Sequence, residues 1–370
     1  MSKYRIDVAV DNLPQIAAGY SDGVAARVLV EVCNRIQAQF DGVLVECEIA
    51  PWGVSVELAK VWRGMSRVRQ LEEKLKEICS VPITIGHSEL LVALSLLAPG
   101  RNEYAVSAVV DVDQFHRDMS VAISAYRHVF SWRLAFAEED VNDVNLLNDG
   151  LYRECLVRIT DCSGAAVMPG QYFPSLERMG LVRVIDRQIV RAVMDSLTRR
   201  PDVTLGCNIS AASCVNDIWW HSILTDLRLN PDVAKRLVIE ITETVPLRSI
   251  KSGLELVNAL KRTGCKIALD DFGAGYSGIS FAKAALPDII KIDRSFLRFG
   301  TGDAERLRML TNLVTLAGNF ATEIVVEGVE TEADLVNARI AGARWCQGFL
   351  FNQVHRFHGG ALRAPAVSLP

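Results

Sequence analysis

The sequence lacks the features that would place it across a membrane or on nucleic acid. Its longest apolar run, residues 90–99, is much shorter than the roughly 20 residues that a membrane-spanning helix needs. Its first residues contain no apolar signal core. The 370 residues carry a formal net charge of −4, which does not favour a polyanionic partner. We therefore expect neither direct membrane insertion nor bulk nucleic-acid binding.

Paired cysteines are also missing. Nine cysteines are scattered singly along the chain, and no Cys-x-x-Cys pair occurs. This spacing is typical of buried, reduced thiols rather than of a disulfide framework or a zinc site. The pattern predicts a cytoplasmic protein.

The length exceeds what one hydrophobic core usually serves, so two domains are expected, one of them a barrel of about 240 residues. Residues 1–125 mix helical patterns with strand-like runs and predict a smaller α+β domain. The second domain is placed at residues 126–360. The acidic, asparagine-rich stretch between residues 133 and 150 is interpreted as a loop or hairpin turn.

Beyond that stretch, short apolar runs alternate with amphipathic helical patterns. Strands that alternate with helices form a parallel sheet, and eight such units fit a (β/α)8 barrel. A doubly wound open sheet is the structural alternative. The expected strands cover residues 130–136, 155–159, 203–209, 237–242, 266–270, 288–293, 323–329 and 345–351.

Most of these runs end at, or lie next to, a polar residue of a catalytic type. In a parallel barrel the carboxyl ends of the strands meet at one face, where active sites lie. A single carboxylate at a strand end is often only the N-cap of the next helix, but that explanation is poor for the whole set. The side chains expected to crowd into one mouth are Glu154, Asn208, Glu240, Asp270, Asp271 and Glu327.

Five carboxylates cannot share a buried pocket as free anions, because like charges repel and burial penalises each of them. Divalent cations would neutralise them, and an all-oxygen ligand set favours Mg²⁺ or Mn²⁺ over zinc. A two-metal site suits in-line displacement at phosphorus. Lys291 would then orient the attacking water or offset charge on the phosphate. Alternatively, Lys291 and Asp293 form a surface ion pair.

These strings occur in the order typical of the EAL domain family, which residues 128–353 resemble. The family's Glu-Ala-Leu-x-Arg motif appears as Glu154-Cys-Leu-Val-Arg158. The later motifs appear as Asn208-Ile-Ser, Glu240-Ile-Thr-Glu243, Asp270-Asp271-Phe-Gly, Lys291-Ile-Asp293, Glu327-Gly-Val-Glu330 and Gln347-Gly-Phe. The resemblance implies a barrel with one antiparallel strand that hydrolyses cyclic-di-GMP to linear pGpG in bacterial second-messenger signalling. The few departures, such as Cys155 in place of alanine, remove no metal ligand.

The resemblance also assigns roles to individual residues. It implies a two-metal set of Glu154, Asn208, Glu240, Asp270, Asp271 and Glu327 that holds Mg²⁺ or Mn²⁺. It implies catalytic roles for Lys291, Glu327 and Glu154, and substrate-binding roles for Arg158, Asp293, Glu330 and Gln347. Glu243 would anchor the loop of residues 271–277, which in this family couples dimerisation to metal binding. A homodimer formed through the barrel is therefore expected.

The N-terminal region resembles a degenerate GGDEF domain, the usual partner of an EAL domain. The Gly-Gly-Asp-Glu-Phe string is absent, and Ala50-Pro-Trp-Gly53 lies about where it should be. We therefore expect this domain to regulate rather than to synthesise cyclic-di-GMP. Two alternatives to an active phosphodiesterase are a catalytically silent cyclic-di-GMP receptor that signals through the N-terminal domain, and an unrelated Mg²⁺-dependent barrel such as a lyase or isomerase.

Overall fold

The computed structural model divides the chain into two compact units. The first comprises residues 1–133, 159–185 and 217–222, and the second comprises residues 134–158, 186–216 and 223–370. The predicted boundary between residues 125 and 126 stays a prediction. Two later segments, residues 159–185 and 217–222, pack with the first unit. The structure describes residues 3–59, 65–97, 110–130, 134–146, 150–160, 166–242, 249–274, 278–297, 303–351 and 355–356.

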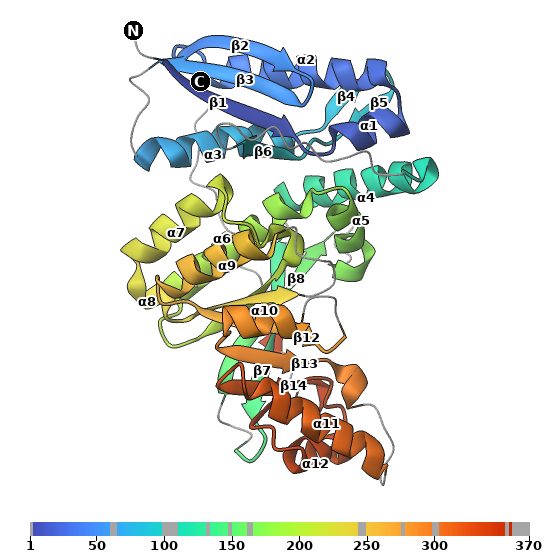
Figure 1. The fold of residues 1–370 in the computed structure, drawn as a ribbon, viewed down its shortest axis with the longest axis vertical. Helices are drawn as coiled ribbons and strands as arrows, with labels where there is room; N and C mark the ends of the chain where they lie inside the picture. Colours follow the sequence, from blue (N-terminus) through green and yellow to red (C-terminus); the bar gives the residue numbers. More distant parts are fainter. Residues whose placement is uncertain are drawn as a thin grey trace. The chain divides into compact units, whose positions relative to one another are not determined.

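The first unit contains an antiparallel sheet with the strand order β2-β3-β1-β6. Its strands are β1 (Lys3–Val10), β2 (Leu44–Ala50), β3 (Gly53–Ala59) and β6 (Leu94–Leu97). Helix α2 (Asp22–Gln39) packs along β2 and β3, as Figure 1 shows. The unit also contains α1 (Leu13–Gly19), α3 (Met65–Ser80), α4 (Val112–Phe130) and the hairpin of β4 (Ile83–Ile85) and β5 (Ser88–Leu90). The α+β prediction is confirmed, although the strand-like runs of the sequence did not include β1, β5 or β6.

Contacts within this unit explain why it includes later parts of the chain. The Arg178 guanidinium lies 2.7 Å from the buried Asp118 carboxylate on α4. Arg183 lies 3.1 Å from Asp11, and the Trp219 indole donates to the Leu94 carbonyl oxygen at 3.2 Å. The segments that follow two barrel strands are therefore bonded to the N-terminal region through charged and polar groups.

Eight of the described strands form a closed barrel, which rules out the open sheet. Strands β8 to β15, apart from the short β9 (Ala166–Val167), pair in parallel with their neighbours, whereas β7 is antiparallel to β15 and also pairs with β8. The prediction of one reversed strand is thus confirmed. The barrel strands are β7 (Leu134–Asp143), β8 (Gly150–Thr160), β10 (Leu205–Ser210), β11 (Leu237–Thr242), β12 (Lys266–Phe272), β13 (Ile289–Ile292), β14 (Glu323–Val326) and β15 (Trp345–Cys346).

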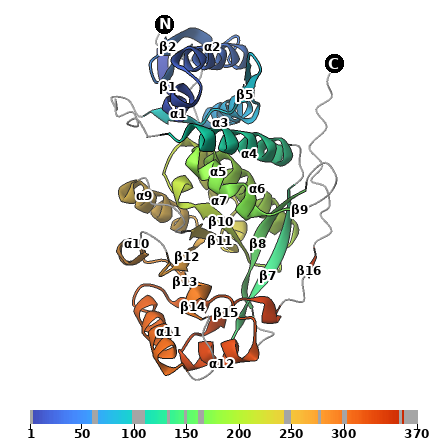
Figure 2. The same ribbon diagram turned by 90° about the vertical axis from the view of Figure 1, so that its right-hand side faces the viewer.

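Helices follow most of the barrel strands, as their amphipathic patterns predict. Figure 2 shows α9 to α12 on the outside of the strands. Helix α12 begins with a capping box in which Thr331 accepts from the Asp334 amide at 3.2 Å, as the sequence predicts. The helices are α5 (Phe173–Arg178), α6 (Val182–Arg199), α7 (Ile218–Leu229), α8 (Pro231–Ala234), α9 (Ile250–Lys261), α10 (Gly278–Ala285), α11 (Ala304–Ala317) and α12 (Glu332–Ile340). A short strand, β16 (His355–Arg356), pairs with β7.

The loop or turn predicted for the acidic stretch is wrong for residues 137–143, which continue β7 from the strand predicted at residues 130–136. Arginine side chains from neighbouring elements compensate the acidic residues of this strand. Glu138 pairs with Arg200 and lies 3.5 Å from Arg153, which in turn lies 2.9 Å from Asp140. Paired charges can occupy a barrel strand, whereas a local pattern of acidic residues indicates a turn.

No helix in the part of the chain that the structure describes is both long enough and apolar enough to cross a membrane.

Candidate metal centre

The site is built on an apolar layer inside the barrel. Because side chains alternate between the two faces of a strand, a residue two positions after a layer residue points into the barrel one level higher. In the apolar layer lie Val141, Tyr152, Val238, Ala268, Ile289, Val325 and Trp345. Two positions after six of them come Glu154, Glu240, Asp270, Lys291, Glu327 and Gln347. The alternation therefore stacks a polar layer directly on the apolar one.

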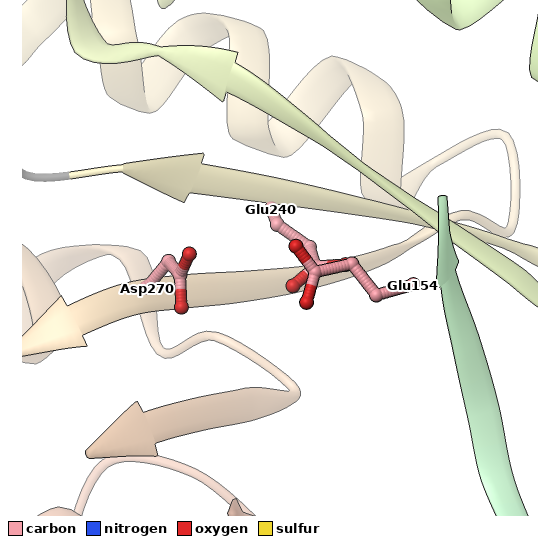
Figure 3. A group of neighbouring side chains, drawn as sticks. All are labelled: Glu154, Glu240 and Asp270. Carbon is pink, nitrogen blue, oxygen red and sulfur yellow. The ribbon is translucent and has the colours of Figure 1, made fainter. Parts of the chain in front are cut away.

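The polar layer contains two groups of acidic side chains that could each hold a metal ion. In each group, the ligand oxygen atoms lie within 4.8 Å of one another. Glu154, Glu240 and Asp270 form the first group, in which the Glu154 and Glu240 carboxylates approach each other and Asp270 lies beside them (Figure 3). Asp270, Asp271 and Glu327 form the second group. Since Asp270 belongs to both, the arrangement fits two cations that share a bridging carboxylate.

Lys291 lies between the carboxylates of the first group and that of Glu327. Its side chain is fully buried, and its ammonium nitrogen contacts four carboxylates. The distances from Nζ are 2.9 Å to Glu154 Oε2, 2.9 Å to Glu240 Oε2, 3.1 Å to Asp270 Oδ1 and 2.7 Å to Glu327 Oε1. The alternative of a surface ion pair between Lys291 and Asp293 is wrong, because Lys291 points into the barrel.

Burial and mutual repulsion shift the ionisation of these carboxyl groups. Burial, with the charge of Glu154, raises the pKa of Glu240 to about 8. Burial and the neighbouring Asp270 raise the pKa of Asp271 to about 6, and burial also raises the pKa of Glu327. Burial acts in the same direction on Glu154, but the Lys291 charge and hydrogen bonds overcome it and leave the pKa of Glu154 lowered. Without additional positive charge, carboxyl groups with raised pKa values therefore stay protonated at a higher pH than they would in water.

A backbone irregularity places Asp271 beside Asp270. Adjacent residues of a regular strand point to opposite faces, so both side chains could not face the same site. The register between β12 and β13 shifts between Leu269 and Phe272, and Asp271 has a φ of 57°, in the left-handed region. Such a conformation is unfavourable for a residue other than glycine and is typical of functional sites. The bulge turns Asp271 toward the shared cluster.

The chemistry of the donor set fits divalent cations bound by oxygen. Five carboxylates and one ammonium group converge here, which leaves four negative charges if all are ionised. Two divalent ions would balance that charge. The Asn208 side-chain amide donates a hydrogen bond to Glu154. Asn208 Oδ1 and Glu240 Oε1 are both buried without a hydrogen-bond partner among the described residues. Oxygen atoms left free in this way suit Mg²⁺ or Mn²⁺.

The raised pKa values predict that the metal-free protein loses stability as the pH rises from about 5 to about 8. The ordinary pKa values of a glutamate and an aspartate side chain, here Glu240 and Asp271, are 4.5 and 3.8. The folded chain therefore binds more protons than the unfolded chain in this window. The free energy of unfolding then falls with rising pH. The stabilising effects of Glu154, whose pKa is lowered, and of Lys291, whose pKa is raised, are both present throughout this window, because the first is lost only at lower pH and the second only at higher pH.

Thermal unfolding in the presence of a chelator, at pH 5.5 and pH 8, measures this effect. Added Mn²⁺ should raise the melting temperature more at pH 8, because the ions compete with protons for the same oxygens. A Glu240→Gln variant, which lacks the titrating group, should show a weaker pH dependence. A metal-free melting temperature that is higher at pH 8 than at pH 5.5, with no change in this variant, would contradict the assignment.

The other predicted site residues occupy different surroundings. The Gln347 side chain is buried and donates to Glu154 Oε2 at 2.6 Å. Arg158 lies on the same face of β8 as Glu154, four residues further on, and donates to the Val157 carbonyl oxygen at 3.0 Å. Gln347 is therefore part of the polar layer, and Arg158 lies beyond it. The substrate-binding roles of both stay predictions.

Two further candidates, Asp293 and Glu330, form local hydrogen bonds. Asp293 accepts from the Ser295 amide at 3.0 Å and caps the short helix of residues Arg294–Phe296. Glu330 is exposed, and its backbone amide contacts Asp334 Oδ2 at 3.2 Å. Glu243 lies outside the described residues. Their predicted roles are untested.

Sequence reasoning missed two residues at this site. Glu139 on β7 forms a side-chain hydrogen bond with Gln347, and burial together with the charge of Glu154 raises its pKa. Tyr152 lies beneath the cluster and donates to Glu240 Oε2 at 3.1 Å. Glu139 was hidden in the stretch interpreted as a loop. Tyr152 could have been found from its position two residues before Glu154.

The fold and the site together define a (β/α)8 barrel with an acidic centre at the carboxyl ends of its strands. The EAL domain model matches residues 144–353, more than half of the chain. The chain belongs to the EAL domain family, so the predicted resemblance is confirmed.

Curated relatives share this region. An uncharacterised protein of Mycobacterium tuberculosis is 32% identical over 232 residues, covering 59% of this chain and 37% of that protein. The cyclic di-GMP phosphodiesterase PdeL of Escherichia coli is 32% identical over 208 residues, covering 54% of this chain and 56% of PdeL. The bifunctional diguanylate cyclase/cyclic di-GMP phosphodiesterase MucR of Pseudomonas aeruginosa is 26% identical, covering 93% of this chain and 54% of MucR. The chain thus spans about a third to just over half of these relatives.

Solved structures share the fold. The MucR phosphodiesterase in complex with c-di-GMP superposes with a TM-score of 0.56 at 24% identity, covering 64% of this chain and 97% of that one. The S helix-GGDEF-EAL region of Vibrio cholerae LapD, bound to c-di-GMP, superposes with a TM-score of 0.58 at 14% identity. That match covers 95% of this chain and 90% of the LapD chain.

Proposed function

We propose that this chain hydrolyses cyclic-di-GMP to linear pGpG with the help of two divalent cations, Mg²⁺ or Mn²⁺. The observation that carries the proposal is the pair of acidic groups that share Asp270, with Lys291 between their carboxylates. Membership of the EAL family, together with relatives named as cyclic di-GMP phosphodiesterases, supports the choice of substrate.

The residues divide between two cation positions. Glu154, Asn208, Glu240 and Asp270 would hold one ion, and Asp270, Asp271 and Glu327 would hold the other. Bound there, the ions would supply an activated water and stabilise charge on the phosphate. Lys291 keeps its proton, because the surrounding carboxylates raise its pKa well above the ordinary value although burial opposes this. Its ammonium group is placed to orient the water and to offset phosphate charge.

One P–O bond to a ribose oxygen breaks in the proposed reaction, and water supplies the new oxygen on phosphorus. The proton of the attacking water leaves toward the carboxylate layer, in which Glu327 contacts Lys291. The ribose oxygen takes up a proton on departure. One hydrolysed phosphodiester therefore gives a linear dinucleotide with a terminal phosphate.

A chromatographic assay tests the proposal. The full chain is incubated with cyclic-di-GMP and Mg²⁺ or Mn²⁺, and the appearance of pGpG is followed over time. We expect turnover with either ion and none with excess chelator. If the chain showed no binding and no turnover of cyclic-di-GMP, the proposal would be contradicted. An unrelated Mg²⁺-dependent barrel would then remain.

Tight binding without turnover would instead favour the second candidate, a receptor that signals through the N-terminal unit. The LapD chain that shares this fold over nearly the whole length was solved bound to c-di-GMP, so the shared fold is compatible with nucleotide binding. The retained acidic groups favour hydrolysis, since a receptor does not need two bound metal ions at its centre. In either case we propose a regulatory role for the GGDEF-like N-terminal unit, a homodimer through the barrel and a cytoplasmic location.

A further inference from the structure

Tyr152 occupies a position directly beneath the acidic centre. It belongs to the apolar layer, and its side chain is 4% exposed. Its hydroxyl donates to Glu240 Oε2 at 3.1 Å, across from β8 to β11. Most of the layer consists of aliphatic side chains, which make no such bond. Tyr152 therefore connects the barrel core to the acidic centre by a hydrogen bond.

The sequence of the next strand makes room for this ring. Gly206 on β10 lies in the same layer, two residues before Asn208. A Cβ atom at this position would lie 2.3 Å from Glu240 Oε1 and 2.5 Å from Tyr152 Cε2. Any side chain here would displace either the tyrosine ring or the glutamate. Tyr152 and Gly206 thus form a matched large and small pair under Glu240.

The hydrogen bond leaves the two oxygens of Glu240 with different roles. Oε2 accepts from Tyr152 and lies 2.9 Å from Lys291 Nζ. Oε1 is buried and has no hydrogen-bond partner in the part of the chain that the structure describes. A carboxylate with one oxygen held on the core has its other oxygen directed at a fixed place. Hydrogen bonds to a ligating carboxylate normally fix its orientation in this way.

We propose that Tyr152 is a positioning residue that holds Glu240 so that its Oε1 atom is presented to a divalent cation. This role rests on the proposed function, because the cation that Glu240 would bind is the one proposed to support hydrolysis. Tyr152 itself touches neither substrate nor cation. Its effect is on the affinity of the centre for Mn²⁺ or Mg²⁺, because Glu240 would otherwise have to be ordered when the ion binds.

Tyr152→Phe removes the hydroxyl and keeps the ring over Gly206. Calorimetric titration of the metal-free full chain with Mn²⁺ alone measures the affinity without any turnover. We expect Mn²⁺ binding to weaken about 10- to 100-fold, as for other partners of metal ligands. In the hydrolysis assay, the Mn²⁺ concentration for half-maximal rate should rise by a similar factor, while the rate at saturating Mn²⁺ stays near that of the wild type.

Tyr126→Phe provides a matched control. The Tyr126 hydroxyl is also buried and donates to the Leu181 carbonyl oxygen at 2.8 Å, in the first unit. Removing it should leave Mn²⁺ affinity unchanged. A purely structural role of Tyr152 would lower the melting temperature in both variants and alter Mn²⁺ affinity in neither, which would overturn the inference.

The two proposals fail in different ways. If the wild type binds Mn²⁺ but does not produce pGpG, the proposed function is wrong, and Tyr152→Phe still tests the positioning role by calorimetry. If the wild type hydrolyses cyclic-di-GMP and Tyr152→Phe binds Mn²⁺ with unchanged affinity, the inference about Tyr152 is wrong and the proposed function stands.

Discussion

Replacing Glu154 with glutamine should lower the rate of cyclic-di-GMP hydrolysis by about 1,000-fold or more, equivalent to about 4 kcal/mol of transition-state stabilisation. The carboxylate belongs to the first acidic group and receives hydrogen bonds from Asn208, Lys291 and Gln347. Glutamine keeps the shape of the side chain but removes the negative charge and one oxygen ligand. The loss should therefore appear in chemistry and in cation binding rather than in folding.

The rate of pGpG formation and the Mn²⁺ stoichiometry, measured on the same preparation, check this prediction. Glu138→Gln is a useful control, because Glu138 is a buried carboxylate on the neighbouring strand that pairs with Arg200 instead of the acidic centre. It should lower stability and leave the rate within a few-fold of the wild type. Wild-type turnover by the Glu154→Gln variant would show that the strand ends do not carry the chemistry.

The barrel and most of its centre follow from local sequence patterns. Apolar runs with polar residues at their ends predict both the strands and the convergence of their side chains. Glu154, Glu240 and Asp270 are recognisable because each comes two residues after a core position, and the period of two in a strand then fixes the direction of the side chain. This alternation is local, so it can be recognised from the sequence alone.

Features that depend on tertiary partners could not be predicted in this way. Strand β7 reads as a loop because the charges of Glu138 and Asp140 are compensated only by Arg200 and Arg153 from elsewhere in the fold. The left-handed backbone at Asp271 is likewise invisible in the string Asp-Asp-Phe-Gly, since a regular strand would turn its side chain away.

The position of Lys291 shows what the pattern leaves open. The sequence places it at a strand end and leaves a surface ion pair with Asp293 as an alternative to a catalytic role. The structure buries its ammonium group among four carboxylates, three from strands and one from Glu327, which directly follows β14. Burial, together with repulsion between carboxylates that a single positive charge cannot balance, explains the raised pKa values of Glu240 and Glu327. The same imbalance provides the attraction for cations.

Lys291→Met should therefore abolish hydrolysis and also lower the free energy of unfolding of the metal-free protein by about 3–5 kcal/mol, the usual cost of removing one partner of a buried ion pair. Methionine fills a similar volume, so the loss arises from uncompensated carboxylates. The cost should be larger at pH 8 than at pH 5.5, because protons can replace the lysine charge at the lower pH. Denaturant unfolding in the presence of a chelator, at both pH values, measures it.

Saturating Mn²⁺ should recover much of the stability of Lys291→Met at pH 8 without recovering its activity, because cations can supply the missing charge but not the ammonium donor. Lys261→Met serves as the control. Lys261 lies 3.9 Å from Asp288 with both side chains partly exposed, and such pairs contribute about 0–1 kcal/mol. If Lys291→Met were as stable as this control at pH 8, the four carboxylates would have to be protonated in the metal-free protein. The charge argument for two divalent cations at this centre would then fail.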